Sequence, residues 1–190
     1  FQKLAPLDIR IICSTHGPVW KENISKAVDI YDRLSRYEGK EGAVIVCGSM
    51  YGNTVQMAEA VAQGLVQGGI KNVIIHDICK TEDSYIVSDI FKYRGLIVGS
   101  ATYCNDLHPD IYSLLNKVEI RQIKNRDYAY FGSYSWASAA VKKLAEFGEK
   151  MKWRTVDFSV EEKMGLKENN YHSCICLGEK MAELLKNPNR

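Results

Sequence analysis

The sequence predicts an α/β protein in which a five-stranded parallel sheet lies between two layers of helices. From residue 43 onwards, short β-branched and apolar runs alternate with segments whose apolar residues recur at helical spacing. Runs that are apolar almost throughout are typical of parallel strands covered on both faces, and parallel strands need crossover connections, which are usually helices. At 190 residues the chain is long enough for one compact domain with a sizeable core.

The opening segment precedes this regular pattern. A strand is expected over residues 7–13, and apolar spacing predicts a helix over residues 24–37. Residues 38–42, Glu-Gly-Lys-Glu-Gly, combine two glycines with three charges and predict a boundary. We therefore divide the chain into residues 1–40 and a main domain over residues 41–190. Because the sequence does not begin with methionine and enters directly into a strand, we expect a piece of a longer polypeptide.

Five strands and five helices alternate in the main domain. Each strand is a short apolar run, and each helix shows apolar residues three or four positions apart. The expected strands cover residues 43–48, 72–76, 95–100, 128–132 and 154–160, and the expected helices cover residues 53–67, 82–91, 109–118, 138–151 and 169–185.

Composition narrows the class of protein. The formal net charge of +2 comes from interspersed charges, so nucleic-acid binding has little support. The six cysteines are scattered without a CxxC pair, which favours reduced thiols and a cytoplasmic location. The longest apolar runs are strand-sized, and no basic segment with an apolar stretch opens the chain. We therefore expect neither a membrane span nor a signal peptide.

A polar loop, Ser-Met-Tyr-Gly-Asn-Thr at residues 49–54, follows the first strand of the main domain and leads straight into a helix. The N–H groups and positive end of that helix can hold a phosphate, and Gly52 lets the backbone approach it closely. Ser49, Asn53 and Thr54 can add hydrogen bonds, although the same residue types also serve as ordinary helix caps. The loop has neither the GxGxxG nor the GxxxxGK[ST] pattern, so a monophosphate fits better than NAD or ATP.

Two further loops are expected at the same edge of the sheet. Residues 99–105 follow the third strand and residues 131–137 follow the fourth, and the carboxyl ends of parallel strands meet at one edge. Aromatic side chains from the three loops would then surround one site for a planar aromatic ligand. Each aromatic residue taken singly is more often a packing residue. These aromatic residues are Tyr51, Tyr103, Tyr134 and Trp136.

Together the three loops resemble the phosphate loop and the two flavin-ring loops of the flavodoxin-like domain of flavodiiron proteins, also called A-type flavoproteins. The resemblance covers residue 43 to about residue 185. It implies a flavodoxin-like three-layer sandwich with strand order 2-1-3-4-5 and non-covalently bound FMN. The residues expected to bind this cofactor are Ser49, Met50, Tyr51, Gly52, Asn53, Thr54, Ser100, Ala101, Thr102, Tyr103, Cys104, Asn105, Ser133, Tyr134, Ser135 and Trp136.

Residues 12–20 resemble the segment of the same family where a metallo-β-lactamase-like domain ends. By this resemblance residues 1–40 are a remnant of that domain with a linker helix, and His16 would be a di-iron ligand in an intact protein. The HxHxDH cluster of the family is absent, so no metal site is expected within these residues. No catalytic side chain is expected either, because FMN carries the electrons. Cys104 is expected to be a small buried packing residue.

The resemblance implies an electron-transfer domain that relays electrons, through FMN, to a di-iron site that reduces oxygen or nitric oxide. The expected partners are a redox protein such as rubredoxin or a flavin reductase, and the di-iron domain of the intact protein. Whether this chain alone is an oxidoreductase is left open, as is a homodimer. The alternatives are a free-standing flavodoxin, an NAD(P)H:quinone reductase, or a non-enzymatic receiver-type signalling module. A receiver needs acidic residues where Cys47, Gly48 and Ser100 stand.

Overall fold

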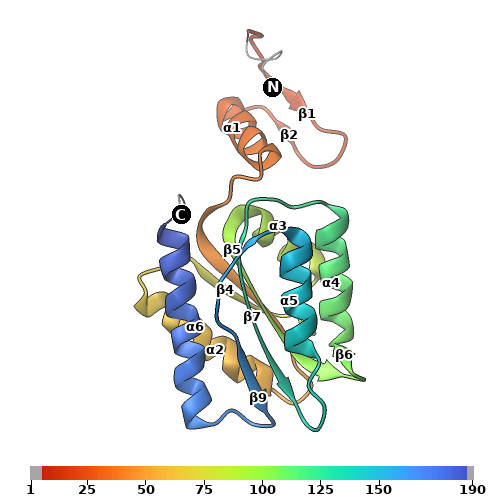
Figure 1. Ribbon diagram of the computed structural model, residues 1–190. Coiled ribbons are helices and arrows are strands. Elements are labelled where there is room, and N and C mark those ends of the chain that lie inside the picture. The colour runs from red at the N-terminus through yellow and green to blue at the C-terminus, as the bar shows by residue number, and fades with distance from the viewer. Residues whose placement is uncertain (1–5, 188–190) are drawn as a thin grey trace. The chain divides into compact units, whose positions relative to one another are not determined.

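The computed structural model describes residues 6–187. The chain forms two compact units, one ending at Glu38 and the other beginning at Gly39 (Figure 1). Each unit has its own secondary structure, and the parallel sheet belongs to the second. Among the described residues, no helix has the length and apolar character needed to cross a membrane.

The first unit contains a short hairpin and a helix. Strands β1 (Ile12–Cys13) and β2 (Val19–Trp20) pair antiparallel, and helix α1 (Ile24–Ser35) follows. The prediction of a strand over residues 7–13 was wrong apart from its last two residues. Among residues 6–187 this strand pairs with β2 alone, through Ile12 and Cys13, and the side chain of Ile11 is 54% exposed. A longer strand would therefore lack a pairing partner within the described residues. The predicted helix is confirmed and ends two residues early.

The second unit is built on a parallel sheet whose strands run in the order β4-β3-β5-β7, with β8 and β9 both beyond β7. This arrangement confirms the predicted fold class and the order 2-1-3-4-5, because β8 and β9 share the fifth position. The strands are β3 (Lys40–Gly48), β4 (Val73–Asp77), β5 (Tyr93–Tyr103), β7 (Asp127–Tyr134), β8 (Arg154–Thr155) and β9 (Val160–Lys163).

The fifth strand is split, which corrects the single strand predicted over residues 154–160. Thr155 pairs with Tyr128, and Val160 pairs with Phe131. Thr155 and Val160 are five positions apart, whereas their partners on β7 are only three positions apart. Two residues between β8 and β9 must therefore bulge out of the pairing with β7.

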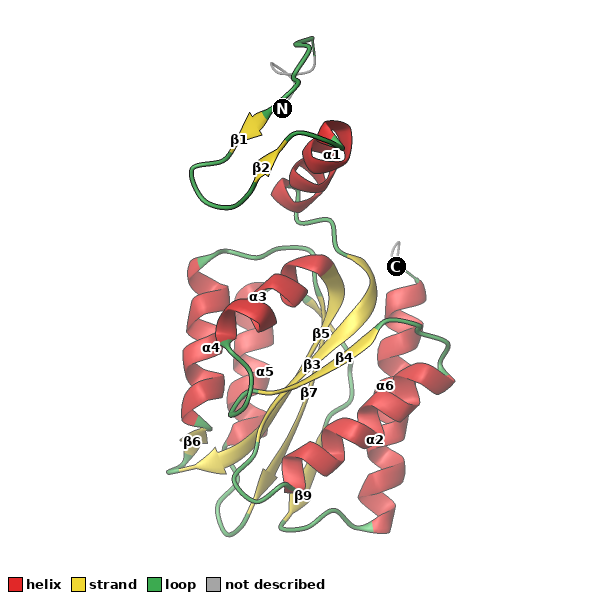
Figure 2. Ribbon diagram, turned by 180° about the vertical axis from the view of Figure 1, so that it is seen from behind, coloured by secondary structure: helices red, strands yellow, loops and turns green. Residues whose placement is uncertain are grey.

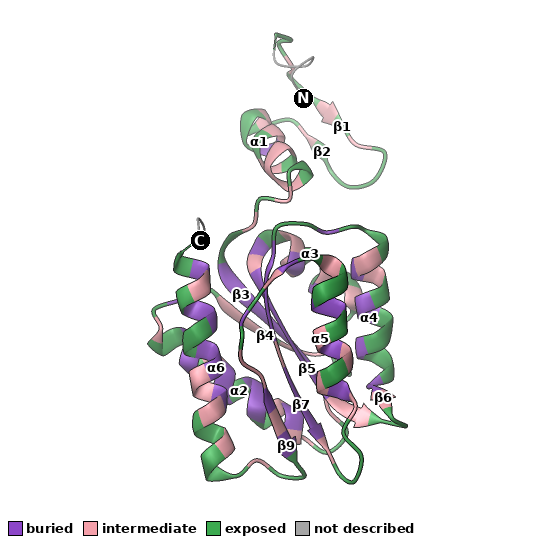
Figure 3. Ribbon diagram, in the orientation of Figure 1, coloured by how far each residue is buried: buried purple, intermediate pink, exposed green. Residues whose placement is uncertain are grey.

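Helices cover both faces of the sheet. Figures 1 and 2 show α2 and α6 on one face and α3, α4 and α5 on the other. The central strands are buried between them (Figure 3), and residues 43–48 of β3 are buried without interruption. This is the expected three-layer sandwich. The helices are α2 (Asn53–Gln67), α3 (Asp83–Lys92), α4 (Pro109–Ile120), α5 (Ala140–Met151) and α6 (Glu168–Lys186).

Candidate functional site

The carboxyl ends of three neighbouring strands lie side by side. Gly48 at the end of β3 is in register with Ser100 of β5, and Ala101 is in register with Ser133 of β7. Along the chain, β3 is followed by β4 on one side of it and then by β5 on the other. The strand order therefore reverses beside β3, which is where ligands bind in open parallel sheets. The structure thus brings the three predicted loops to one edge.

The loop after β3 presents an uncapped helix end. Gly52 is the N-cap of α2 in a left-handed conformation (φ 88°), and no side chain of the described residues caps that helix. The N–H of Gly52 donates to Oγ of Ser49 at 3.0 Å, which closes the loop. A Cβ built on Gly52 has no heavy atom within 4 Å. Open space beside helix N–H groups that lack a side-chain acceptor fits a phosphate.

Several hydroxyl groups of the predicted site hold the loops together. Thr54 is fully buried, and its Oγ1 lies 2.9 Å from Oγ of Ser133, so the first loop is tied to the third. Thr102 accepts hydrogen bonds from the backbone N–H groups of Ala139 and Ala140, at 3.3 and 3.1 Å, and so caps the start of α5. These side chains fix the shape of the edge, which leaves backbone groups and aromatic rings to meet a ligand.

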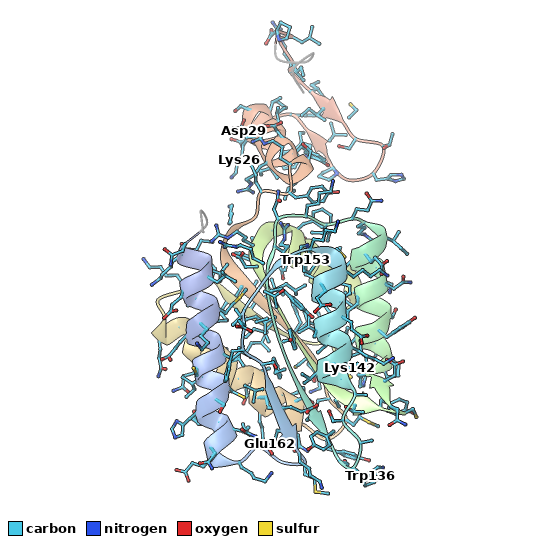
Figure 4. All side chains as sticks on the ribbon, in the orientation of Figure 1. Lys26, Asp29, Trp136, Lys142, Trp153 and Glu162 are labelled. Atoms are coloured by element: carbon cyan, nitrogen blue, oxygen red, sulfur yellow. The ribbon has the colours of Figure 1, made fainter. Side chains whose placement is uncertain are left out.

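Large apolar side chains project from the same edge. Tyr51 is 88% exposed and Trp136 is 89% exposed, while Met50 and Tyr103 are exposed to 50% and 40%. Figure 4 shows Trp136 at the end of the second unit to which the strands of the sheet point. Exposed aromatic residues gathered at one edge are typical of a surface that binds a flat apolar group. The predicted ring site therefore has suitable side chains.

The second loop is a tight hairpin that sequence analysis missed. Strand β5 continues to Tyr103, turns through Cys104 and Asn105, and returns as β6 (Asp106–Leu107). Both turn residues have positive φ, 47° and 58°, as a two-residue turn of type I′ requires. The turn places Cys104 at the surface, so the prediction of a buried packing residue was wrong. This turn is hard to predict from sequence, since Cys-Asn is not one of the usual turn pairs.

Cys79 and His108 also belong to this edge, although sequence analysis assigned them no role. The Sγ of Cys79 lies 3.7 Å from Nε2 of His108 and 3.9 Å from the carbonyl oxygen of Ser49. His108 is 9% exposed, and its backbone N–H donates to Oγ of Ser100 at 2.9 Å. The pair therefore connects the first loop to the start of α4. A histidine before Pro109, which begins that helix, was the available signal.

Cys79, His108 and Asp110 bring three metal-capable atoms within 4.8 Å of one another. The Nδ1 of His108 accepts the backbone N–H of Asp110 at 3.3 Å, so the proton of the neutral imidazole lies on Nε2, which faces the thiol. Although Cys79 is an exposed residue, desolvation of its sulfur raises the pKa of the thiol, which keeps it protonated. This arrangement favours a hydrogen-bonded pair over a metal site. His16, which the sequence predicts as a di-iron ligand only in an intact protein, is exposed in the first unit.

Known proteins resemble this chain along most of its length. An uncharacterised protein of Methanocaldococcus jannaschii is 31% identical over 179 residues, which are 94% of this chain and 45% of the relative. The rubredoxin oxygen:oxidoreductase of the anaerobe Desulfovibrio gigas has a TM-score of 0.90 at 24% identity, covering 98% of this chain and 47% of that one. The flavodiiron protein of Giardia intestinalis has a TM-score of 0.84 at 22% identity, covering 100% and 48%. This chain thus spans less than half the length of these three proteins.

The two structural likenesses show the fold and confirm the predicted resemblance at that level. Residues 45–183 match the flavodoxin family. A flavodoxin domain is an FMN-binding electron-transfer module, so the predictions of FMN as the cofactor and of an electron-transfer role are confirmed. The match favours this role over the receiver-type alternative. Since the matched residues make up more than half of the chain and include all three loops at the carboxyl edge of the sheet, the chain belongs to the flavodoxin family.

Proposed function

We propose that this chain is the flavin relay of a flavodiiron-type oxidoreductase. Its FMN would receive electrons from a rubredoxin-like protein or a flavin reductase and pass them to a di-iron site that reduces oxygen or nitric oxide. The observation that carries the proposal is the edge where an uncapped α2, an open space at Gly52 and exposed aromatic residues meet. The names of the two structural relatives, which mention rubredoxin, oxygen and di-iron, support the choice of partners.

In this proposal the first loop holds the FMN phosphate and the other two flank the ring. The N–H groups of Asn53 and Thr54, at the start of α2, face the phosphate, and the positive end of the helix favours its charge. Tyr51, Tyr103 and Trp136 cover the ring and exclude water. The bound flavin supplies the electron-transfer chemistry, and the chain positions it.

The first unit belongs to the proposal as the end of a metallo-β-lactamase-like domain. Its exposed His16 would then join a di-iron site in a longer protein, together with ligands from outside this chain. All six cysteines are free thiols, which supports a reducing, cytoplasmic location. A head-to-tail homodimer would bring the flavin of one subunit close to the iron of the other.

FMN titration of the FMN-free chain tests the site. Flavin fluorescence gives the Kd for the wild type, for Trp136→Ala and for a control, Tyr31→Ala. Tyr31 is an aromatic residue of the first unit with 56% exposure. Loss of one ring contact should raise Kd about two- to tenfold in Trp136→Ala, while Tyr31→Ala binds like the wild type. Equal affinities in all three proteins would contradict the proposed ring site.

Alkylation of Cys104 provides a second test that needs no mutation. Cys104 and Cys13 are both exposed, the first in the ring hairpin and the second in the first unit. Bound FMN should slow the reaction of Cys104 with iodoacetamide and leave that of Cys13 unchanged, as measured by peptide mass spectrometry. If FMN protects neither thiol or both equally, the ring does not lie against this hairpin.

A further inference from the structure

A pocket opens at the amino-terminal edge of the parallel sheet, opposite the FMN site. It has a volume of about 330 Å³, and we call it the amino-edge pocket. Figure 4 shows Trp153, which belongs to it, at the other end of the second unit from Trp136. The side chains that matter for the argument are Arg94, Arg126, Asp127, Lys152, Trp153 and Arg154.

The lining of the amino-edge pocket is strongly cationic. Arg94, Arg126, Lys152 and Arg154 bring four positive charges, and Asp127 is the one carboxylate, so the lining carries a net charge of 4 − 1 = +3. The side chain of Asp127 is only 3% exposed. It accepts hydrogen bonds from Nε of Arg94 at 2.9 Å and from Nε of Arg154 at 2.8 Å. One buried carboxylate is thus shared between two guanidinium groups.

Two of the four cationic side chains donate hydrogen bonds to carbonyl oxygens at helix C-termini. Arg126 donates to the carbonyl oxygens of Ile90 and Phe91, at 2.9 and 3.1 Å, near the end of α3. Arg154 donates to the carbonyl oxygen of Leu184 at 2.9 Å, near the end of α6. Cations are favourable at helix C-termini because the last carbonyl groups carry partial negative charge. This explains Arg126 and Arg154 without a ligand.

The positive charges of Arg94 and Lys152 are not explained by contacts with helix ends. The Nη2 of Arg94 is buried and has no hydrogen-bond partner in the described part of the chain. Lys152 is exposed, and among residues 6–187 it forms no ion pair. A buried donor left without an acceptor costs free energy, so the Nη2 of Arg94 calls for an acceptor in the pocket. An anion in the pocket would balance the positive charge of the lining and accept a hydrogen bond from Nη2 of Arg94.

We propose that the amino-edge pocket binds the phosphate group of a small phosphorylated molecule. Guanidinium forks match the geometry of phosphate oxygens, and a net charge of +3 favours an anion with more than one negative charge. The volume lies at the lower end of the range for small-molecule sites, which suits a compact phosphate ester or a diphosphate. The inference does not rest on the FMN site, which lies at the other edge.

Calorimetric titration with inorganic pyrophosphate tests the pocket. The chain is first loaded with FMN and freed of excess cofactor, so that the phosphate loop is filled, and ionic strength is held constant. The wild type should bind one pyrophosphate. Arg94→Gln should raise Kd about tenfold. Lys152→Gln should raise Kd only about threefold, since the exposed ammonium group is screened by solvent.

The matched control is Lys142→Gln. Lys142 lies on α5, the helix that Lys152 follows, but its side chain is 84% exposed and outside the pocket. This variant should bind pyrophosphate like the wild type. Absence of binding to the wild type at millimolar concentration would overturn the proposal, as would equal weakening by Lys142→Gln and Lys152→Gln. If Arg94→Gln fails to fold, the exposed Lys152 position decides the question alone.

Discussion

Gly48 and Gly52 lie four residues apart beside the phosphate loop and are needed for different reasons. A Cβ on Gly48 would lie 2.8 Å from Cγ of His108, so Gly48→Ala should overpack the interior and lower the free energy of unfolding by about 1–3 kcal/mol. A Cβ on Gly52 meets no atom, and its cost of about 1–2 kcal/mol comes from the positive φ alone.

Urea unfolding and FMN titration together separate these two effects. Both variants lose stability, but Gly52→Ala should also lose FMN affinity by at least about tenfold, because its Cβ lies where the phosphate approaches the backbone. A Gly52→Ala chain that binds FMN like the wild type would show that the phosphate lies elsewhere.

The cysteines differ in reactivity because burial differs. Desolvation raises the pKa of Cys47 to about 12, and likewise raises that of Cys174 to about 12, so both stay protonated thiols at neutral pH. Iodoacetamide should label exposed Cys13 and Cys104 in the native chain, whereas Cys47 and Cys174 react only after denaturation. Mass spectrometry at successive times measures the order in which the cysteines are labelled. Labelling of Cys47 at the rate of Cys104 would show that β3 opens readily.

Much of the candidate site could be predicted from the sequence because its loops are local in the chain. Ser49 to Thr54 form a loop between a strand and a helix that adjacent residues specify. The contact of Thr54 with Ser133 joins residues 79 positions apart, and the contact of Cys79 with His108 joins residues 29 positions apart. Such pairs depend on the register between neighbouring strands, which a single sequence does not reveal.

At the scale of elements, Glu162 connects the end of the sheet to the start of α6. It is 1% exposed, and its carboxylate accepts hydrogen bonds from the backbone N–H of Lys167 at 3.1 Å, from Nζ of Lys167 at 2.6 Å and from Nδ2 of Asn170 at 2.9 Å. Burial disfavours the charge, but these donors outweigh it and lower the pKa of Glu162 below 4.5.

Because this pKa is lowered in the folded chain, its stabilising effect is present above pH 4.5 and is lost as pH falls through the folded value. Glu162→Gln should therefore cost about 2 kcal/mol at neutral pH, and the difference from wild type should shrink in acid. Urea unfolding across this pH range measures it. Glu179→Gln, an exposed change on α6, is the control and should differ little at any pH. A pH-independent difference would contradict the role of the Glu162 charge.

The crossing of α2 and α6 depends on two glycines. A Cβ on Gly178 would lie 2.1 Å from the carbonyl oxygen of Val61, and one on Gly64 would lie 2.0 Å from that of Ile175. Gly178→Ala should therefore separate the helices and lower the free energy of unfolding by about 3 kcal/mol. Gly165→Ala is the matched control, because its Cβ meets only a side-chain oxygen at 3.9 Å. Similar midpoints in urea for both variants would contradict this close packing.

The bounds of helices were predicted from the sequence more accurately than those of strands. Helix α2 has the bounds predicted for it, because its apolar spacing is regular and Gly68 follows its end. Strand β5 is longer than predicted at both ends, since it pairs with β3 before the apolar run and with β7 and then β6 after it. The division of the fifth strand into β8 and β9 could not be foreseen, because two looped-out residues leave no mark in a short apolar stretch.

At the scale of the whole second unit, parallel alternation makes the two sheet edges chemically different. Helices that return between parallel strands place their N-termini at the carboxyl edge and their C-termini at the amino edge. The carboxyl edge therefore attracts anions to backbone N–H groups, as at the start of α2 beside Gly52. The amino edge carries cations such as Arg126 and Arg154, which donate hydrogen bonds to helix carbonyl groups. In the amino-edge pocket, Arg94 and Lys152 are cations beyond the two that contact helix carbonyl groups.

The chain as a whole should carry electrons without reducing the final acceptor. A di-iron site needs several carboxylate and imidazole ligands that converge. Within residues 6–187 the metal-capable group is Cys79, His108 and Asp110, where the imidazole faces the thiol with its proton. We therefore expect the FMN-loaded chain, given ferrous iron and a reduced rubredoxin, to accept electrons but not to consume nitric oxide catalytically. Flavin absorbance records the reduction, a nitric oxide electrode records turnover, and FMN without protein gives the background. Sustained consumption above that background would place a complete reductase site in these residues and would remove the reason to regard the chain as a relay.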